Sequence, residues 1–108
     1  NVRGYLLEID TVPAGLAAIA EKADGDFEMC EFYVVPCFRQ NAAGMRFAHA
    51  IWRRHGGTWE IKQIGGADYA TAFWRKTIRR YNDTPFAEER YDDPYWGNVI
   101  RQRFALGR

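Results

Sequence analysis

The sequence lacks the features that mark several specialised classes of protein. No apolar run approaches the roughly 18 residues that a membrane-spanning helix needs, and no basic-then-apolar secretory signal opens the chain. An excess of one charge is also missing, because 15 Lys and Arg against 14 Asp and Glu leave a formal net charge of +1. A dedicated polyanion binder usually has a clear basic excess. We therefore expect a cytoplasmic protein, with neither a membrane nor a nucleic acid as its partner.

Cysteine is scarce as well, since only Cys30 and Cys37 occur. On one extended segment these residues would lie about 23 Å apart and on opposite faces, so a disulfide would require the chain to fold back. Neither their spacing nor that of His49 and His55 suits a metal site. We expect two buried, reduced thiols and no bound metal.

The chain is rich in apolar and aromatic side chains. Its 108 residues are 47% hydrophobic and 16% aromatic, which is typical of a folded chain around one hydrophobic core. This length allows one domain at most, spanning 1–108. The first residue is Asn1 rather than Met, which suggests a processed chain or a fragment.

Hydrophobic periodicity predicts the order β-β-β-α-β-α-β-β. A strand–helix–strand unit in the middle implies a right-handed parallel crossover, so the expected class is α+β (mixed α/β), with one mixed sheet and two packed helices. Turn residues at 11–15 and 92–94 separate strands. The strand at 27–35 is apolar on both faces near its end, as a doubly covered central strand should be. The predicted strands are 4–10, 16–21, 27–35, 58–64, 86–91 and 99–106, and the predicted helices are 43–55 and 68–81.

The most informative stretch is residues 31–45, Glu-Phe-Tyr-Val-Val-Pro-Cys-Phe-Arg-Gln-Asn-Ala-Ala-Gly-Met. A buried strand ends at Pro36, and a helix begins near Ala43 after a loop of small residues. The first turn of a helix presents unpaired N–H groups and a partial positive charge, which can hold a phosphate. Residues 40–45 are therefore a candidate phosphate cradle, with an ordinary strand–helix connection as the alternative.

This stretch resembles the central motif of the GNAT superfamily of acetyl-CoA-dependent N-acetyltransferases. That motif is a strand, a Pro, an aromatic residue, and then Arg/Gln-x-x-Gly-x-Gly/Ala at the start of a helix; Arg39, Ala42 and Gly44 fall on its marked positions. Downstream, Trp59-Glu60-Ile61 is similar to the family's next strand. The segment from Ala67 to Lys76 is similar to its Asn-x-x-Ala-x-x-Phe/Leu-Tyr-x-Lys helix. The resemblance covers nearly the whole chain and lacks the family's N-terminal strand and two helices.

The resemblance implies a set of cofactor contacts. The pantetheine arm of acetyl-CoA would pair with main-chain groups of Phe32, Tyr33 and Val34, as a neighbouring strand would. Arg39 and Trp74 would lie beside the cofactor. Amides of the cradle would bind the pyrophosphate, and these belong to Gln40, Asn41, Ala42, Ala43, Gly44 and Met45.

The resemblance also implies a direct reaction in a ternary complex, in which a base deprotonates the attacking amine. Glu31 and Glu60 are the candidate catalytic bases, and we expect a raised pKa for a partly buried carboxylate. Each could instead be a solvent-facing strand residue.

Three positions depart from the family pattern. Ala42 replaces a glycine, which would weaken the site if the loop needs a positive φ. Ala67 stands where an Asn often contacts the cofactor. Trp74 stands where a Tyr often serves as general acid, and an indole N–H has no usable acidity. The acid would then be water, Tyr69 or Tyr81.

Three functions from different classes remain open. The first is an N-acetyltransferase acting on a primary amine. The second is a non-catalytic member of the same fold that binds acyl-CoA or another small ligand, and the third is an unrelated small α+β interaction domain. Without the family's first strand, a sheet edge and an apolar face would be uncovered, so we expect a homodimer. Arg53-Arg54 and Arg79-Arg80 are expected to be solvated helix ends, with contacts to an outer cofactor phosphate or to nucleic acid as the alternatives.

Overall fold

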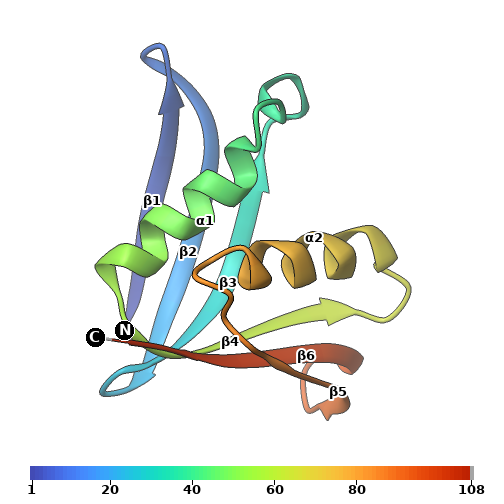
Figure 1. The fold of residues 1–108 in the computed structure, drawn as a ribbon. Helices are drawn as coiled ribbons and strands as arrows, with labels where there is room; N and C mark the ends of the chain where they lie inside the picture. Colours follow the sequence, from blue (N-terminus) through green and yellow to red (C-terminus); the bar gives the residue numbers. More distant parts are fainter. Residues whose placement is uncertain (108) are drawn as a thin grey trace.

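The strands form one six-stranded sheet, and both helices pack on the same face of it (Figure 1). The computed structural model describes residues 1–107. The sheet order is β1-β2-β3-β4-β6-β5. The strands are β1 (Val2–Ile9), β2 (Val12–Ala23), β3 (Asp26–Val34), β4 (Gly57–Ile64), β5 (Ala87–Asp93) and β6 (Gly97–Leu106), and the helices are η1 (Pro36–Phe38), α1 (Ala43–Arg54) and α2 (Asp68–Arg79).

The predicted class and order of elements are confirmed, with the short 3-10 helix η1 as an addition. The β3–α1–β4 unit is the expected parallel crossover, and every other strand pair is antiparallel. In the described residues, neither helix is long and apolar enough to cross a membrane.

Two turn predictions were wrong. The β1–β2 turn is the pair Asp10 and Thr11, whose φ angles are 51° and 65°, and strand pairing resumes at once with Val12. A tight two-residue hairpin with positive φ at both positions accounts for this turn, so Pro13 and Gly15 belong to β2. At the other end, β5 continues to Asp93 and the chain turns at 94–96.

Aromatic side chains form the centre of the core between the sheet and the helices. Trp52 of α1 is 1% exposed. Its ring centroid lies 5.1 Å from that of Phe104 and 6.3 Å from those of Trp59 and Trp74. Edge-to-face aromatic packing of this kind adds to the gain from burial. The cluster therefore joins α1 to β4, β6 and α2.

A β-bulge interrupts β3. Ile19 of β2 pairs with Met29 while the next residue back, Ala18, pairs with Glu31, so Cys30 is the extra residue. A bulge shifts the alternation of the side chains by one, and Phe32 therefore faces the helices as Met29 does. As a result, Glu31 and the residue after Phe32 lie on the opposite, helix-free face.

This arrangement overturns two expectations. The end of β3 is covered on one face only, since Tyr33 is 48% exposed on the helix-free face. The two thiols are free, but both are exposed rather than buried. Cys30 is exposed at the bulge, and Cys37 is exposed in η1.

A contact between Tyr5 of β1 and His55 generates a pH-dependent prediction. The Tyr5 hydroxyl is hydrogen-bonded to His55 Nε2. Burial, together with the charges of Arg3 and Arg54, lowers the pKa of His55 below 6.5. A group whose pKa is lower in the native state than in the unfolded state stabilises the fold fully when the pH is above its unfolded-state pKa. That stabilisation is lost as the pH falls through the native pKa. Between pH 8 and pH 5, we expect urea denaturation to show a larger loss of stability for the wild type than for His55→Gln. Parallel losses in the two proteins would contradict this.

Candidate functional site

The parallel strands β3 and β4 pair over a short distance and then separate. Their ladder joins Asp26–Met29 to Thr58–Ile61 and goes no further (Figure 1). The open region between the two separating strands is the splay. Beyond the ladder, β3 pairs only with β2, so the edge of β3 that faces β4 has no strand partner.

At the end of β3, successive residues direct their main-chain N–H and C=O groups alternately towards β2 and towards the splay. The Val35 N–H donates to the carbonyl oxygen of Ala14 in β2 at 2.7 Å. Successive residues of a strand direct their main-chain groups to opposite edges, so Val34 and Phe32 present theirs to the splay. Tyr33 is paired with Leu16 of β2. Of the three residues predicted to hold the pantetheine arm, two direct main-chain groups into the splay.

Arg39 folds back onto this strand end. Its Nε donates to the Val34 carbonyl oxygen at 2.7 Å, and its guanidinium carbon lies 5.4 Å from the centroid of the Tyr33 ring. Arg39 therefore places a positive charge at the open end of the splay.

The loop before α1 has a positive φ at Ala42, where the family pattern has a glycine. Asn41 and Ala42 both have a φ of 55°, which costs an alanine about 1–2 kcal/mol. The Ala43 N–H donates to the Gln40 carbonyl oxygen at 3.1 Å, and no side chain caps the helix. The next amides, of Gly44 and Met45, belong to the first turn, whose N–H groups have no partner within the helix. They form an uncapped N-terminus beside the end of β3.

Gly44 has a packing role at this point. A Cβ on Gly44 would lie 3.3 Å from two ring carbons of Phe73 and 3.8 Å from Val34 Cγ2. The missing side chain therefore lets the first turn of α1 approach α2 and β3 closely. This need for glycine is independent of any bound phosphate.

Trp74 is part of the core. It is 6% exposed, and its ring centroid lies 4.9 Å from those of Phe32 and Phe73. Of the candidate replacement acids, Tyr69 is fully on the surface of α2 and Tyr81 packs against Trp52. Neither tyrosine lies on β3 or β4.

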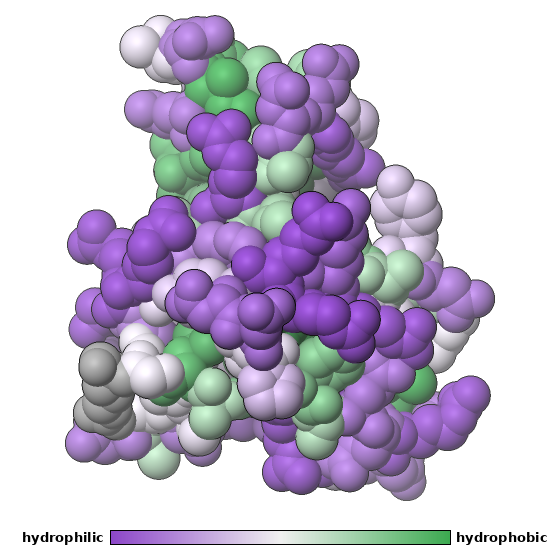
Figure 2. Space-filling model, in the orientation of Figure 1, coloured by the Kyte–Doolittle hydropathy of each residue, from purple (hydrophilic) through white to green (hydrophobic). Residues whose placement is uncertain are grey.

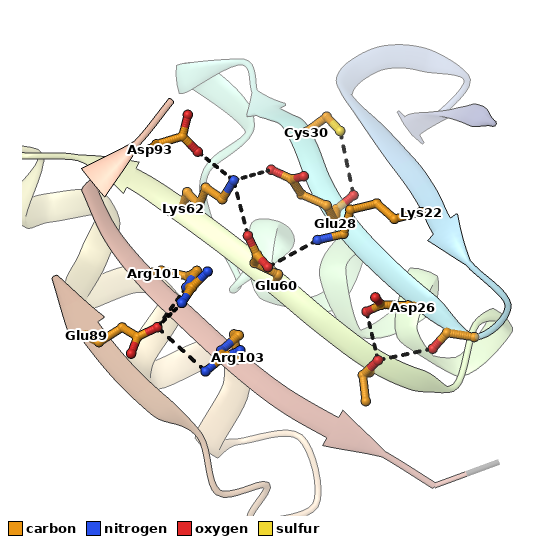
Figure 3. Close-up of polar contacts among 12 residues, drawn as sticks. Lys22, Asp26, Glu28, Cys30, Glu60, Lys62, Glu89, Asp93, Arg101 and Arg103 are labelled. Carbon is orange, nitrogen blue, oxygen red and sulfur yellow. Dashed lines mark hydrogen bonds and ion pairs between the residues drawn. The ribbon is translucent and has the colours of Figure 1, made fainter. Parts of the chain in front are cut away.

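The helix-free face carries a network of ion pairs at the vertex of the splay (Figure 3). Glu60 Oε1 lies 3.1 Å from Lys22 Nζ, and Glu60 Oε2 lies 3.2 Å from Lys62 Nζ. Lys62 Nζ also contacts Asp93 Oδ2 at 2.7 Å and Glu28 Oε2 at 3.6 Å. Lys62 thus links β3, β4 and β5.

The pKa of Glu60 is lowered, so the expected raised pKa was wrong. Burial opposes its charge, but the hydrogen bonds from Lys22 and Lys62 outweigh that effect. Asp93 has a pKa of about 2 because Lys62 and the amides of Trp96 and Tyr95 donate to it. Burial opposes the charge of Lys62, but its hydrogen bonds to Asp93 and Glu60 outweigh that effect and raise its pKa. All three groups are therefore charged at neutral pH.

Sequence reasoning missed Lys62 and Asp93. The signals were present: Glu60 and Lys62 alternate on one face of β4, and Asp93 precedes a proline at a turn. Glu31 lies on the same helix-free face, two residues beyond the parallel ladder. It is exposed, and no ion pair engages it within residues 1–107. The two candidate bases thus share a face but differ in surroundings.

Two surface hollows lie away from the open edge of β3. One of about 470 Å³ is lined by Phe27, His55 and Tyr81 among others. Another of about 500 Å³ lies between β1 and α1 and is lined by Leu7 and Phe47, and it reaches Ala43 of the candidate cradle. The splay is instead an open strand edge between the two central strands of the sheet.

Solved structures share this architecture, although the sequence matches no protein-family model and no curated protein. A GNAT family acetyltransferase from Elizabethkingia anophelis with acetyl-CoA bound superposes with a TM-score of 0.74 at 12% identity, over 95% of this chain and 75% of that one. A Bacillus subtilis acetyltransferase in complex with CoA superposes with a TM-score of 0.70 at 11% identity, over 96% of this chain and 76% of that one. A spermidine N-acetyltransferase from Vibrio cholerae superposes with a TM-score of 0.71 at 12% identity, over 96% of this chain and 65% of that one.

The class that these elements define is an α+β fold with one mixed sheet and splayed parallel strands. It is the fold of the GNAT acetyltransferases. At these identities the likeness establishes the fold.

The left-handed conformation of Ala42 leads to a prediction with an internal control. Ala42→Gly should raise the free energy of unfolding by about 1 kcal/mol, because glycine adopts a positive φ without strain. Ala50→Gly, the same substitution on the exposed middle of α1, should lower it by about 1 kcal/mol. Urea denaturation of both variants measures the difference. Destabilisation by both substitutions would show that Ala42 is not strained.

Proposed function

We propose that this chain is an acetyl-CoA-dependent N-acetyltransferase of the GNAT superfamily. One observation carries the proposal: an open strand edge at the end of β3 lies beside the uncapped N-terminus of α1. These are the two main-chain surfaces that an extended arm ending in a diphosphate requires. Solved structures of the same fold hold acetyl-CoA or CoA.

Main-chain groups would bind the cofactor. Phe32 and Val34 would pair with the pantetheine arm, and the amides of the loop and first turn, 40–45, would receive the diphosphate. Arg39 would add a positive charge at the junction of these two surfaces. Tyr33 would line the helix-free side of the arm rather than bind it through its main chain. In this assignment, Trp74 supports Phe32 from the core.

The chemistry we propose is direct transfer on the helix-free side of the splay. Acetyl-CoA would supply the acetyl thioester. A bond forms between the amine nitrogen and the acetyl carbon, and the carbon–sulfur bond breaks with its electron pair on sulfur. Glu31 takes the amine proton, since its carboxylate is exposed beside the splay. Water protonates the thiolate, because Trp74 has no acidic proton to give.

Glu60 has a different role in this proposal. Its lowered pKa and its two lysine partners make it a poor proton acceptor. It would fix Lys62 and, through Lys62, the end of β5. The pair of candidate bases therefore divides into one base and one positioning residue.

The expectations about assembly and location stay proposals. Apolar side chains are exposed on the helix-free face and along β1, among them Val2, Leu6 and Leu16. We propose that a second copy covers them in a homodimer and that the protein acts in the cytoplasm as a single domain over 1–108. A non-catalytic acyl-CoA-binding role remains the second candidate, favoured by the indole of Trp74 at the position of the expected acid.

Cofactor binding can be tested at Ala42 without disturbing the fold. Asp and Asn both tolerate the left-handed conformation, but only Asp would place a negative charge beside the diphosphate. In titration calorimetry with acetyl-CoA, we expect Ala42→Asn to bind as the wild type does. Ala42→Asp should bind at least about tenfold more weakly, the effect of like charges near a surface. Equal binding by both variants, or none by the wild type, would refute the proposed cradle.

Turnover assays distinguish the proposed roles of Glu31 and Glu60. With an amine panel that includes spermidine and a lysine peptide, release of free thiol reports the reaction. Glu31→Gln should lower kcat by about 100-fold or more and leave the KM for acetyl-CoA unchanged. Glu60→Gln should instead lower the free energy of unfolding, on the order of 1 kcal/mol, with a smaller loss of kcat. The opposite pattern would assign the base to Glu60, and full activity in Glu31→Gln would remove Glu31 from the mechanism.

A further inference from the structure

The two helices and the rest of the chain carry opposite charge. Helices α1 and α2, with the C-cap Arg80, contain seven of the 15 Lys and Arg residues and only one of the 14 Asp and Glu residues, Asp68. The remainder of the chain is correspondingly acidic. The net charge of +1 is therefore the sum of a basic pair of helices and an acidic remainder. The total charge, which argues against a polyanionic partner, does not describe the helix layer.

Six cations of this layer have no ion-pair partner within residues 1–107. The seventh, Arg75, is paired with Glu88 of β5. In the space-filling view from the helix side, hydrophilic side chains dominate the front of the molecule (Figure 2). The six cations are all exposed, and they are Arg46, Arg53, Arg54, Lys76, Arg79 and Arg80.

Helix-end electrostatics favour most of these cations. The dipole of a helix favours cations at its C-terminal end, where Arg53, Arg54, Lys76, Arg79 and the C-cap Arg80 lie. Arg46 lies near the start of α1, where the dipole disfavours a cation. Neither helix offsets its cations with acidic neighbours at the usual three- or four-residue spacing. The helices therefore present an exposed excess of cations that no acidic neighbour at this spacing offsets.

We propose that the outer face of α1 and α2 binds the phosphate backbone of a nucleic acid. Five of the six free cations are arginines, whose planar guanidinium matches phosphate geometry. A membrane or a protein partner would also need apolar anchors. The face has almost none, since Tyr69 is the sole large apolar side chain exposed on these helices in the described chain. A phosphate backbone needs only the cations.

This surface lies across the sheet from the proposed chemistry. Glu31 and Glu60 are on the helix-free face, so nucleic acid bound to the helices would be a docking partner and not the acetyl acceptor. The inference does not require acetyl-CoA binding, and either can fail alone.

Fluorescence anisotropy with a labelled single-stranded RNA of mixed sequence tests the proposal on the full chain. If all six cations meet phosphates, log K should fall with log salt with a slope of about −4. Arg79→Gln/Arg80→Gln should weaken binding by about twentyfold at 100 mM salt, and Arg53→Gln/Arg54→Gln should act alike. The control is Lys22→Gln/Arg103→Gln, which removes the same charge from the helix-free face (Figure 3) and should have little effect.

Several results would overturn the proposal. They are no binding at low salt, equal losses in the control and helix variants, or equal affinity for an acidic peptide or for phosphatidylserine vesicles. Displacement of the RNA by saturating acetyl-CoA would mean that the cations serve the cofactor's phosphates instead. Retention of RNA under that condition would support a separate surface.

Discussion

The short parallel ladder between β3 and β4 is the constraint on which the rest of the structure depends. It ends at Met29 and Ile61, where the bulge at Cys30 keeps β3 with β2. The bulge also turns Phe32 into the aromatic cluster under α1 and α2. One inserted residue therefore opens a strand edge, buries a ring and brings Glu31 to the other face. The packing of that ring against Trp74 anchors the end of β3 beside the splay.

The vertex of the splay is held by charge on one face and by aromatic packing on the other. Lys62 bridges Glu28 and Glu60 across the ladder and reaches Asp93 at the β5–β6 turn. Partly buried pairs of this kind do not by themselves imply high stability. Their geometry here fixes which groups stay charged. The lowered pKa of Glu60 and the raised pKa of Lys62 keep both groups charged at neutral pH. The exposed Glu31 lies on the same face, outside this cluster.

Much of this architecture could be predicted from the sequence, because most elements carried a clear period. Residues 43–55 and 68–81 showed helical stripes, and Pro36 and Gly56-Gly57 marked ends. The misses depend on backbone geometry or on tertiary contacts that composition does not specify. The turn at Asp10 and Thr11 depends on two positive φ angles that the residues tolerate but do not demand. The lowered pKa of Glu60 depends on Lys22, 38 residues before it, and on Lys62, two residues after it. Only Lys22 is distant in sequence.

The two faces of the sheet would receive the two substrates of the proposed reaction. The phosphates of a coenzyme would approach the uncapped start of α1 on the side of the basic helices. An amine would approach the helix-free face, where Glu31 is exposed. The aromatic core lies between the sheet and the helices. The basic surface of the helices is a local feature that the total charge of +1 does not reveal, so each surface must be judged by its own cations and acids.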